Sequence, residues 1–456
     1  MKLYRYRTIE SALLELDSGS FYFAEPAELN DPIEGYVKIF WQGDKPAWEG
    51  LLKNFICSLF YNLQTHLLMS RRFYFSEREN FLSDLQNKSL LSNLHLFDDS
   101  PLSKIFEELG EKFLSEEITQ EVVNFYGADK IKCYGREMEF IFRTLIDAAF
   151  VICVRKCKML GLIRDDFNEK FFDVAYEISF AELCDLSDAA RKQKIEEIEN
   201  LNCDMMESGL LGLKLNRRLS DMNYKFKQEM LWLRFIFPRT YLDRLKEILY
   251  PNGYVVCFSE TPTNSAMWGN YADNHRGICF IYETENIGGR DFINFAAKSL
   301  EVKPIKYSRQ IIEKNFFDTL RHLSFINAED WLTGSGGVKS YKLDDCAATD
   351  EYDEDYQEKF YRKMTDWDYE REYRIFLTDK FHSYDEKFSR NLQYDLKTLT
   401  GIIFGIRTTP DDKLEVIQKL VRLKKSVRNF EFFQAEYDDE TQIISVREKF
   451  LLIKPP

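Results

Sequence analysis

Residues 254–283, YVVCFSETPTNSAMWGNYADNHRGICFIYE, place a polar and aromatic loop between two short apolar runs. The first run, residues 254–258, is β-branched and aromatic and too short for a helix, and the second run, residues 277–282, has the same character. Pro262 follows the first run and lacks the N–H group that a strand would donate. The stretch therefore predicts two strands of a sheet that carry a binding loop between them.

The loop is rich in side chains that stack on rings or form hydrogen bonds. Trp268, Tyr271, Asp273 and Arg276 lie close together in it, with more polar and aromatic capacity than a plain connection needs. Two interpretations of Trp268 stay open. It contacts a ligand, or it belongs to a helix over residues 264–272 that packs the indole into the core.

Four pieces of sequence, in a fixed order, carry a resemblance to a known family. They are LYRYR at 3–7; FYFA at 21–24 with NDPIE at 30–34; CFSE at 257–260 with MW at 267–268, YAD at 271–273 and RG at 276–277; and WDYEREYR at 367–374. In these pieces the chain resembles the bacterial domain of unknown function 2971. The resemblance names a relative and assigns no reaction.

Length and composition favour a globular protein with substantial cores. With 456 residues, 45% of them hydrophobic, the chain is long enough for two domains or for one domain with a large insertion. The net charge of −14 disfavours unspecific attraction to nucleic acid or to anionic membranes. The most apolar helical stretch, residues 140–163, is interrupted by charged side chains, so we expect no membrane crossing.

Cysteine and histidine usage bears on the compartment and on metals. The nine cysteines are scattered, and no secretory signal precedes Leu3, so we expect free thiols and a cytoplasmic location. The five histidines lie far apart in sequence, and no zinc signature appears. We therefore expect no metal cofactor.

Patterning predicts three parts along the chain. Residues 1–45 read as a strand, helix and strand, and residues 251–456 return to strand patterns, so these parts form an α+β core with a small mixed or antiparallel sheet. Residues 46–250 have helical periodicity and are predicted to be a large α-helical insertion that splits the core. This insertion is a candidate lid, partner-binding module or self-association surface. Its clearer helices cover residues 103–116, 136–163, 187–200 and 238–250.

Two polar clusters outside the loop are candidate ligand contacts. Asn30, Asp31 and Glu34 lie in a proline-rich turn, where they either face a ligand or only lock the turn. Residues 370–377 alternate as a strand, which places Glu370, Glu372 and Arg374 on one face. The alternative for that face is an ion pair exposed to solvent.

The residue types available restrict the chemistry. No serine elbow, phosphate-binding loop or complete dinucleotide fingerprint is present, so catalysis would depend on carboxylate, arginine and aromatic groups. Transfer of ADP-ribose from NAD suits such a set. Aromatic faces can hold nicotinamide, an arginine can bind the diphosphate, and a carboxylate can stabilise the oxocarbenium-like ribosyl carbon.

The order of the pieces also resembles the ADP-ribosyltransferases of the DNA-modifying toxin type. This resemblance puts Arg5 on the first strand, Ser259 on the second and the catalytic Glu372 on a late strand. The sequence departs from the pattern because no Ser-Thr-Ser motif is present, and Glu260 is a competing carboxylate. The implied NAD-binding residues are Arg5, Tyr6, Ser259, Trp268, Tyr271 and Arg276. The other site candidates are Asn30, Asp31, Glu34, Glu260, Asp273, Glu370 and Arg374.

Three functions remain open at this stage. The first is an intracellular bacterial toxin or antiviral-defence effector that transfers ADP-ribose from NAD to nucleic acid or protein, or hydrolyses NAD. The second is a module that binds and senses a nucleotide or phage component without catalysis. The third is a metal-dependent nuclease with Asp31, Glu34, Glu260 and Glu372 around Mg²⁺.

Overall fold

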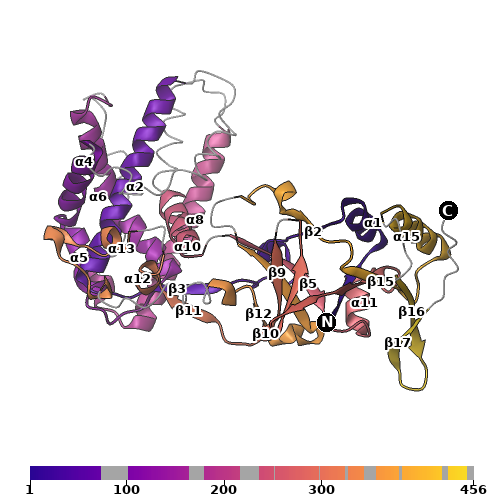
Figure 1. The fold of residues 1–456 in the computed structure, drawn as a ribbon. Helices are drawn as coiled ribbons and strands as arrows, with labels where there is room; N and C mark the ends of the chain where they lie inside the picture. The colour runs from indigo at the N-terminus through magenta and orange to yellow at the C-terminus, as the bar shows by residue number, and fades with distance from the viewer. Residues whose placement is uncertain are drawn as a thin grey trace. The chain divides into compact units, whose positions relative to one another are not determined.

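The computed structural model of the protein describes residues 1–72, 101–163, 179–215, 236–250, 252–296, 298–323, 327–343, 356–378, 383–423 and 430–448. The chain forms two compact units (Figure 1). The sheet unit contains Met1–Val37, Pro251–Ile312 and Asp353–Pro456, and the helical unit contains Lys38–Tyr250 and Glu313–Tyr352. The predicted combination of helices with a mixed sheet is confirmed.

The sheet unit is built on a ten-stranded sheet, which is larger than the small sheet predicted. Strands β15 and β16 are parallel, and the other neighbouring pairs in this sheet are antiparallel. The order is β17 (Ile443–Glu448), β16 (Glu431–Asp438), β15 (Leu399–Phe404), β6 (Ile278–Glu283), β1 (Lys2–Arg7), β5 (Gly253–Ser259), β13 (Glu372–Thr378), β9 (Ser299–Pro304), β8 (Arg290–Asn294) and β7 (Glu285–Ile287).

Side-chain alternation divides the core between the two faces of this sheet. Leu3, Val256, Phe280 and Ile375 belong to a cluster that also takes in residues of α1 (Ile9–Ser18) and α15 (Pro410–Leu423). The opposite face carries a smaller cluster with Tyr6 and residues of α11 (Ser265–Tyr271). The strands β5 and β6 in the middle of the sheet therefore have buried side chains on both faces, which explains their nearly continuous apolar runs.

Two shorter strand pairs complete the sheet unit. Strand β2 (Ser20–Tyr22) pairs with β14 (Asn391–Gln393), and β10 (Lys306–Tyr307) pairs in parallel with β12 (Arg362–Lys363). Short 3-10 helices, η1 (Pro26–Glu28), η6 (Thr365–Glu370) and η7 (Lys387–Arg390), lie in the connections. The predicted strand from residue 370 thus starts two residues later, because Glu370 ends η6 and Arg371 has a left-handed backbone with φ 44°.

Helix α11 decides between the two interpretations of Trp268. The side chain of Asn264 caps the helix and accepts hydrogen bonds from the N–H groups of Ala266 and Met267. Trp268 is fully buried, packs edge-on against Tyr6 with ring centroids 5.1 Å apart, and donates from Nε1 to the carbonyl oxygen of Pro262 at 2.8 Å. Its indole therefore belongs to the core.

The helical unit packs around α2 (Lys45–Arg72), which contacts several of the other helices. The helices predicted within residues 46–250 are present as α4 (Pro101–Leu114), α6 (Gly135–Met159), α8 (Asp188–Leu215) and α10 (Phe237–Leu249). Residues 313–352, assigned from sequence to the second part of the core, lie in this unit. Its other elements are α5 (Glu117–Tyr126), α7 (Phe180–Cys184), α12 (Phe316–Leu320), α13 (Ala328–Trp331), η4 (Ser335–Gly337), η5 (Tyr341–Leu343) and the strands β3 (Val37–Trp41), β4 (Cys133–Tyr134) and β11 (Ile312–Asn315).

Buried aromatic side chains hold the helical unit together. The Phe55 ring of α2 stacks on Phe142 of α6 with centroids 4.7 Å apart, and Tyr241 of α10 donates a hydrogen bond to Asn54 Oδ1 at 2.8 Å. Within the described residues, no helix combines the length and the apolar composition that a membrane crossing requires.

Candidate functional site

A pocket of about 520 Å³ opens in the sheet unit between β1 and β5. These strands share a single register pair, Tyr4 with Ser259, whereas β1 pairs with β6 along its whole length. The separation of β1 from β5 leaves room for side chains from the segment after β2. The lining residues that carry charge or hydrogen-bonding groups are Tyr4, Arg5, Tyr6, Arg7, Tyr22, Glu28, Asn30, Ser259, Tyr271, Lys363, Glu370 and Glu372.

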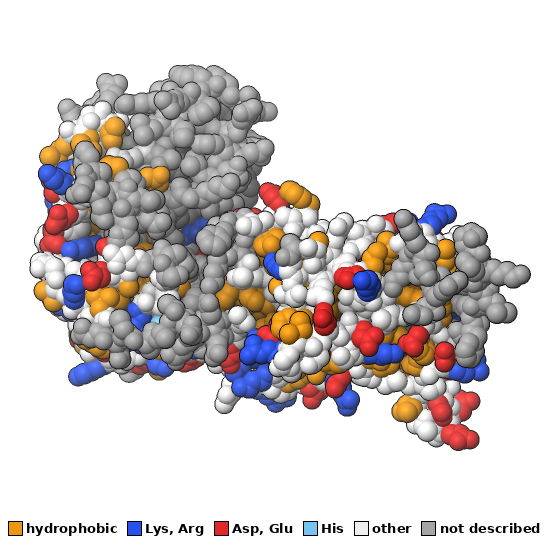
Figure 2. Space-filling model, in the orientation of Figure 1, with side chains coloured by type: hydrophobic (Ala, Val, Ile, Leu, Met, Phe, Trp, Pro, Cys, Tyr) orange, Lys and Arg blue, Asp and Glu red, His pale blue; other side chains and the backbone are white. Residues whose placement is uncertain are grey.

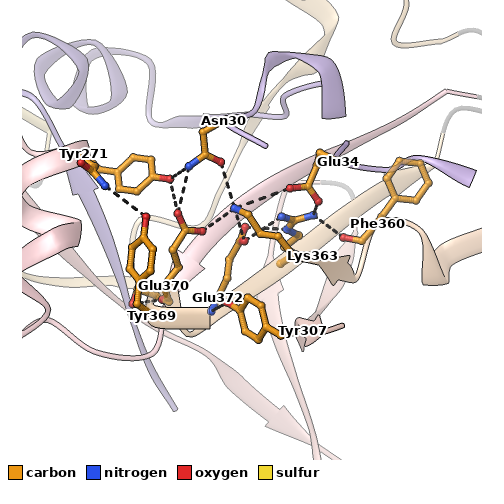
Figure 3. Close-up of polar contacts among 12 residues, drawn as sticks. Asn30, Glu34, Tyr271, Tyr307, Phe360, Lys363, Tyr369, Glu370 and Glu372 are labelled. Atoms are coloured by element: carbon orange, nitrogen blue, oxygen red, sulfur yellow. Dashed lines mark hydrogen bonds and ion pairs between the residues drawn. The ribbon is translucent and has the colours of Figure 1, made fainter. Parts of the chain in front are cut away.

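Lys363 is at the centre of a buried polar network along one wall of this pocket (Figure 3). Its ammonium donates hydrogen bonds to Glu370 Oε2 at 2.6 Å, to Glu372 Oε2 at 3.3 Å and to Asn30 Oδ1 at 3.2 Å. Burial alone would lower the pKa of Lys363, but the two carboxylates outweigh it and raise the pKa above its ordinary value. The lysine therefore stays charged.

Arg374 joins this network to the turn near the N-terminus. Its guanidinium binds Glu372 through both carboxylate oxygens, from Nε at 2.7 Å and from Nη2 at 2.9 Å. From Nη1 it donates to Glu34 Oε1 at 2.6 Å and to the carbonyl oxygen of Phe360 at 2.8 Å. Arg374 is fully buried, so the predicted alternative of an ion pair exposed to solvent is wrong.

The two carboxylates that share Arg374 differ in their pKa shifts. Burial would raise the pKa of Glu372, but the charge and hydrogen bonds of Arg374 and the charge of Lys363 lower it to about 2. Burial raises the pKa of Glu34, and the attraction of Arg374 does not fully offset this rise. Glu372 is therefore a fixed anion, whereas Glu34 is the more easily protonated end of the network.

Tyr271 and Asn30 enclose the second carboxylate of the wall, Glu370. The Tyr271 hydroxyl donates to Glu370 Oε1 at 2.6 Å, and the Asn30 amide donates to the same oxygen at 3.2 Å and also contacts the Tyr271 hydroxyl. The pKa of Tyr271 is raised by burial and by the carboxylate of Glu370. The phenol therefore remains a hydrogen-bond donor at neutral pH.

The opposite side of the pocket carries arginines. Arg5 is buried over the rings of Phe21 and Phe258, and its Nε lies 3.3 Å from Glu15 Oε2. Among the described residues, Nη1 of Arg5 has no hydrogen-bond partner. Arg7 also pairs with Glu15, at 2.9 Å, and its side chain is 28% exposed. One carboxylate thus balances two arginines.

Tyr6 and Ser259 help to shape the pocket. The Tyr6 hydroxyl donates to the carbonyl oxygen of Thr261 at 2.8 Å, and the Ser259 hydroxyl donates to the carbonyl oxygen of Glu370 at 2.8 Å. Both hydroxyls are engaged with the backbone, so they position the end of β5 and η6. Both side chains line the pocket as well.

Several residues proposed from sequence lie outside this pocket. Trp268 is a core residue, and Glu260 is exposed just beyond the end of β5. Asp273 and Arg276 are exposed in the turn after α11, and Arg276 Nη1 lies 3.8 Å from Asp273 Oδ2. Asp31 lines a separate pocket together with Glu34, and Arg374 supports the main pocket from behind without lining it.

Sequence reasoning missed Lys363, Arg7 and Tyr4 as pocket residues. Arg7 and Tyr4 are part of the LYRYR piece, so the motif that identified Arg5 and Tyr6 contained them. Lys363 has no comparable signal, because it lies in the two-residue strand β12 outside every quoted motif. Tyr307 of β10 was also missed; its hydroxyl accepts a hydrogen bond from the N–H group of Glu372 at 2.8 Å.

Comparison with family models gives one match. Residues 267–375 match the family described as protein of unknown function (DUF2971). The predicted family resemblance is confirmed. The DUF2971 segment contains Tyr271, Lys363, Glu370, Glu372 and Arg374, whereas the N-terminal pocket residues lie outside it. No curated protein and no solved structure matched the chain.

The carboxylates proposed for a nuclease do not come together. Glu34 and Glu372 are bridged by Arg374, Glu260 is exposed, and Asp31 faces the separate pocket. In the part of the chain that the structure describes, no group of three or more His, Cys, Asp or Glu side chains is arranged to hold a metal ion. The observed side-chain partners of Glu34 and Glu372 are the cations Lys363 and Arg374.

The lowered pKa of Glu372 predicts a pH-dependent contribution to stability. Because the pKa falls from 4.5 to about 2 on folding, the ionised side chain stabilises the fold by about 3 kcal/mol above pH 4.5, and this contribution disappears as the pH falls toward 2. In urea denaturation at a series of pH values, Glu372→Gln is expected to lower the free energy of unfolding by about that amount at pH 7 and by much less at pH 3.

The exposed Glu415 of α15 provides the matched control for this series. Glu415→Gln is expected to change the free energy of unfolding by less than about 0.5 kcal/mol. A deficit of Glu372→Gln that is equal at pH 7 and pH 3 would contradict the assigned ion pairs.

Proposed function

We propose that the pocket between β1 and β5 binds NAD and that the protein is an ADP-ribosyltransferase-like enzyme, with Glu372 as its catalytic carboxylate. The observation that carries this proposal is the opposite sign of the charged side chains that line the two pocket walls. On one wall, the lining carboxylates of Glu370 and Glu372 outnumber the lining lysine, Lys363, while Arg374 compensates Glu372 from behind the pocket. The opposite wall is positive because Arg5 and Arg7 share one carboxylate, Glu15.

This charge pattern complements the two charged parts of NAD. The diphosphate is anionic and suits Arg5 and Arg7, of which Arg5 has an unpartnered Nη1 among the described residues. The nicotinamide riboside end is cationic and suits the wall of Glu370 and Glu372. The remaining charged lining residue, Glu28, is paired with Lys387 at 2.6 Å, so it does not cancel the positive wall.

The volume and lining of the pocket suit a ligand of nucleotide size. Its volume of about 520 Å³ lies in the range of about 300–1,000 Å³ that small-molecule sites occupy. Tyr4, Tyr22 and Tyr271 provide aromatic surface at the pocket wall. A planar base or nicotinamide ring can stack on such surface, while the arginines fix the orientation of the diphosphate.

Glu372 has the protonation state that the reaction needs. When nicotinamide leaves, positive charge develops at the ribosyl carbon, and an anion fixed in advance stabilises that charge without reorganisation. A pKa of about 2 keeps Glu372 ionised throughout the physiological range. Arg374 and Lys363 also hold the carboxylate in one orientation, so its charge is directed at a defined place in the pocket.

A released ADP-ribosyl group can pass to a nucleic acid, to a protein or to water. Consumption of NAD or modification of essential macromolecules is harmful to a cell, which is why we assign the protein a role as a toxin or antiviral-defence effector. The acceptor would enter from the side of the pocket where the scissile bond lies beside Glu372.

A binding function without turnover is the second candidate. Both carboxylate oxygens of Glu372 already accept hydrogen bonds from Arg374 and Lys363. A carboxylate whose hydrogen-bonding capacity is already used suits a protein that binds a nucleotide and is stabilised by it without catalysing a reaction. Stabilisation of the protein by NAD without nicotinamide release would favour this function over catalysis.

Removal of the Glu372 charge tests the catalytic proposal. Glu372→Gln is expected to reduce nicotinamide release from NAD by about 10²–10³-fold, because the developing cation loses its fixed counter-charge. The measurement is chromatographic quantification of nicotinamide, with and without cell extract as a source of acceptor. Glu260→Gln, at an exposed position one residue after Ser259, is the matched control and should keep the activity. Equal rates for the two variants, or no release by the unaltered protein, would refute the catalytic role.

The positive wall is tested by NAD binding. Arg7→Gln is expected to raise the dissociation constant of NAD by about 10-fold, since one charge-assisted contact to the diphosphate contributes about 1.5 kcal/mol. Isothermal titration of the Glu372→Gln protein avoids turnover during the measurement. In the same background, Arg276→Gln removes an exposed arginine outside the pocket and should leave the affinity unchanged. Equal affinities for both arginine variants would show that the diphosphate does not bind at this wall.

A further inference from the structure

A second pocket of about 510 Å³ lies in the sheet unit beside η1. Its lining includes the carboxylates of Asp31 and Glu34 together with Pro32, Asn252, Lys359 and Phe360. Oε1 of Glu34 accepts a hydrogen bond from Arg374. This pocket therefore lies at the far end of the buried network that holds Glu372 (Figure 3).

Asp31 is a buried acid with an unsatisfied oxygen. The residue is only 4% exposed, and its Oδ1 accepts a hydrogen bond from the N–H group of Ile33 at 3.1 Å. Its Oδ2 has no hydrogen-bond partner among the described residues. A buried carboxylate oxygen without a partner costs free energy, and a ligand that donates to it removes this cost.

Glu34, which also lines this pocket, has a second buried oxygen without a hydrogen-bond partner among the described residues. Its side chain is 1% exposed, and Oε1 binds Arg374, but Oε2 has no hydrogen-bond partner in the described part of the chain and lies 3.9 Å from the Lys363 ammonium. Burial raises the pKa of Glu34, which shows that its negative charge is incompletely compensated. A positive group in the pocket would compensate it.

Charge counting gives the same result. The three buried carboxylates of Glu34, Glu370 and Glu372 outnumber the two cations that bind them, Lys363 and Arg374. Asp31 adds a further negative charge. Glu25, which also lines the second pocket, is already paired with Arg390.

Lys359 reduces the negative charge of the pocket only in part. Its ammonium lies 4.5 Å from the centre of the Phe360 ring, and burial lowers its pKa to about 7. Lys359 carries at most one positive charge, and the two buried carboxylates of Asp31 and Glu34 exceed it.

We propose that this second pocket is a binding site for a small organic cation that carries a guanidinium or primary ammonium group. The charged group would donate to Asp31 Oδ2 and offset the negative charge of Glu34, and its aliphatic stem would pack against Pro32 and Phe360. An organic cation suits the site better than a metal ion, since among the described residues no three acidic, histidine or cysteine groups gather as ligands there. The site is separate from the NAD pocket and does not depend on that assignment.

Isothermal titration of the full chain with agmatine tests this proposal. Asp31→Asn keeps the Oδ1 acceptor of the turn and removes the charge, so it should weaken agmatine binding at least 10-fold. The matched control is Asp439→Asn in the exposed acidic tip of the β16–β17 hairpin, which should bind agmatine as the unaltered protein does (Figure 2). Circular dichroism verifies that both variants are folded.

Further titrations of the unaltered protein keep the test independent of any variant. Butylurea, which resembles the end of agmatine without its charge, and Mg²⁺ are expected not to compete with agmatine. A short peptide with one arginine distinguishes a free cation from a protein side chain, and tighter binding of either probe supports the site. Binding of neither probe, equal binding to Asp31→Asn, or displacement by Mg²⁺ would overturn the proposal.

Discussion

The sheet unit depends on the burial of one arginine. Arg374 has no exposed surface, and removal of a guanidinium from water is tolerated only when its N–H groups are satisfied and its charge is balanced. Its partners are Glu372 two residues away, Glu34 from the N-terminal turn and the backbone of Phe360. Burial of Arg374 in β13 therefore requires contact with Glu34, which is 340 positions away in sequence.

The main pocket follows from this constraint. The turn that carries Glu34 also carries Asn30, so the ion pair with Arg374 brings Asn30 to Lys363 and Glu370. The β1 strand, held by β6, meets β5 at a single pair and leaves the space between them open. One buried ion pair thus accounts for a pocket that contains residues from both ends of the chain and from its middle.

The network also explains why the two pockets differ in character. Arg374 donates to Glu372 from two nitrogens, Nε and Nη2, but to Glu34 only from Nη1. As a result, the pKa of Glu372 is lowered and that of Glu34 is raised. The fixed anion faces the main pocket, and the incompletely compensated acids face the second pocket.

Much of the local structure was predictable from sequence. Apolar runs identified β5 and β6, and alternation placed Glu372 and Arg374 on one face of β13, because both features are encoded over a few neighbouring residues. The number of strands and the inclusion of residues 313–352 in the helical unit were not predictable, since they depend on contacts between distant segments. Trp268 could be read either as core or as ligand contact until the position of Tyr6 was known.

The site residues show the same division. Arg5, Tyr6, Ser259, Tyr271 and Glu372 came from motifs and do line the pocket. Lys363 was missed, because an isolated lysine in a two-residue strand has no pattern, although its ammonium donates hydrogen bonds to Asn30, Glu370 and Glu372. Arg276 and Glu260 were proposed from sequence proximity, and their exposure shows that nearness in sequence does not decide which side chains turn inward.

A double-mutant cycle between Glu34 and Arg374 tests the central claim most directly. Hydrogen exchange of the β13 amides reports the free energy of opening of this strand in the unaltered protein, in Glu34→Gln, in Arg374→Met and in the double variant. If the buried ion pair holds the N-terminal turn against β13, the loss of opening free energy in the double variant should be smaller than the sum of the two single losses by at least about 1.5 kcal/mol. Effects that add within about 0.5 kcal/mol would contradict the account.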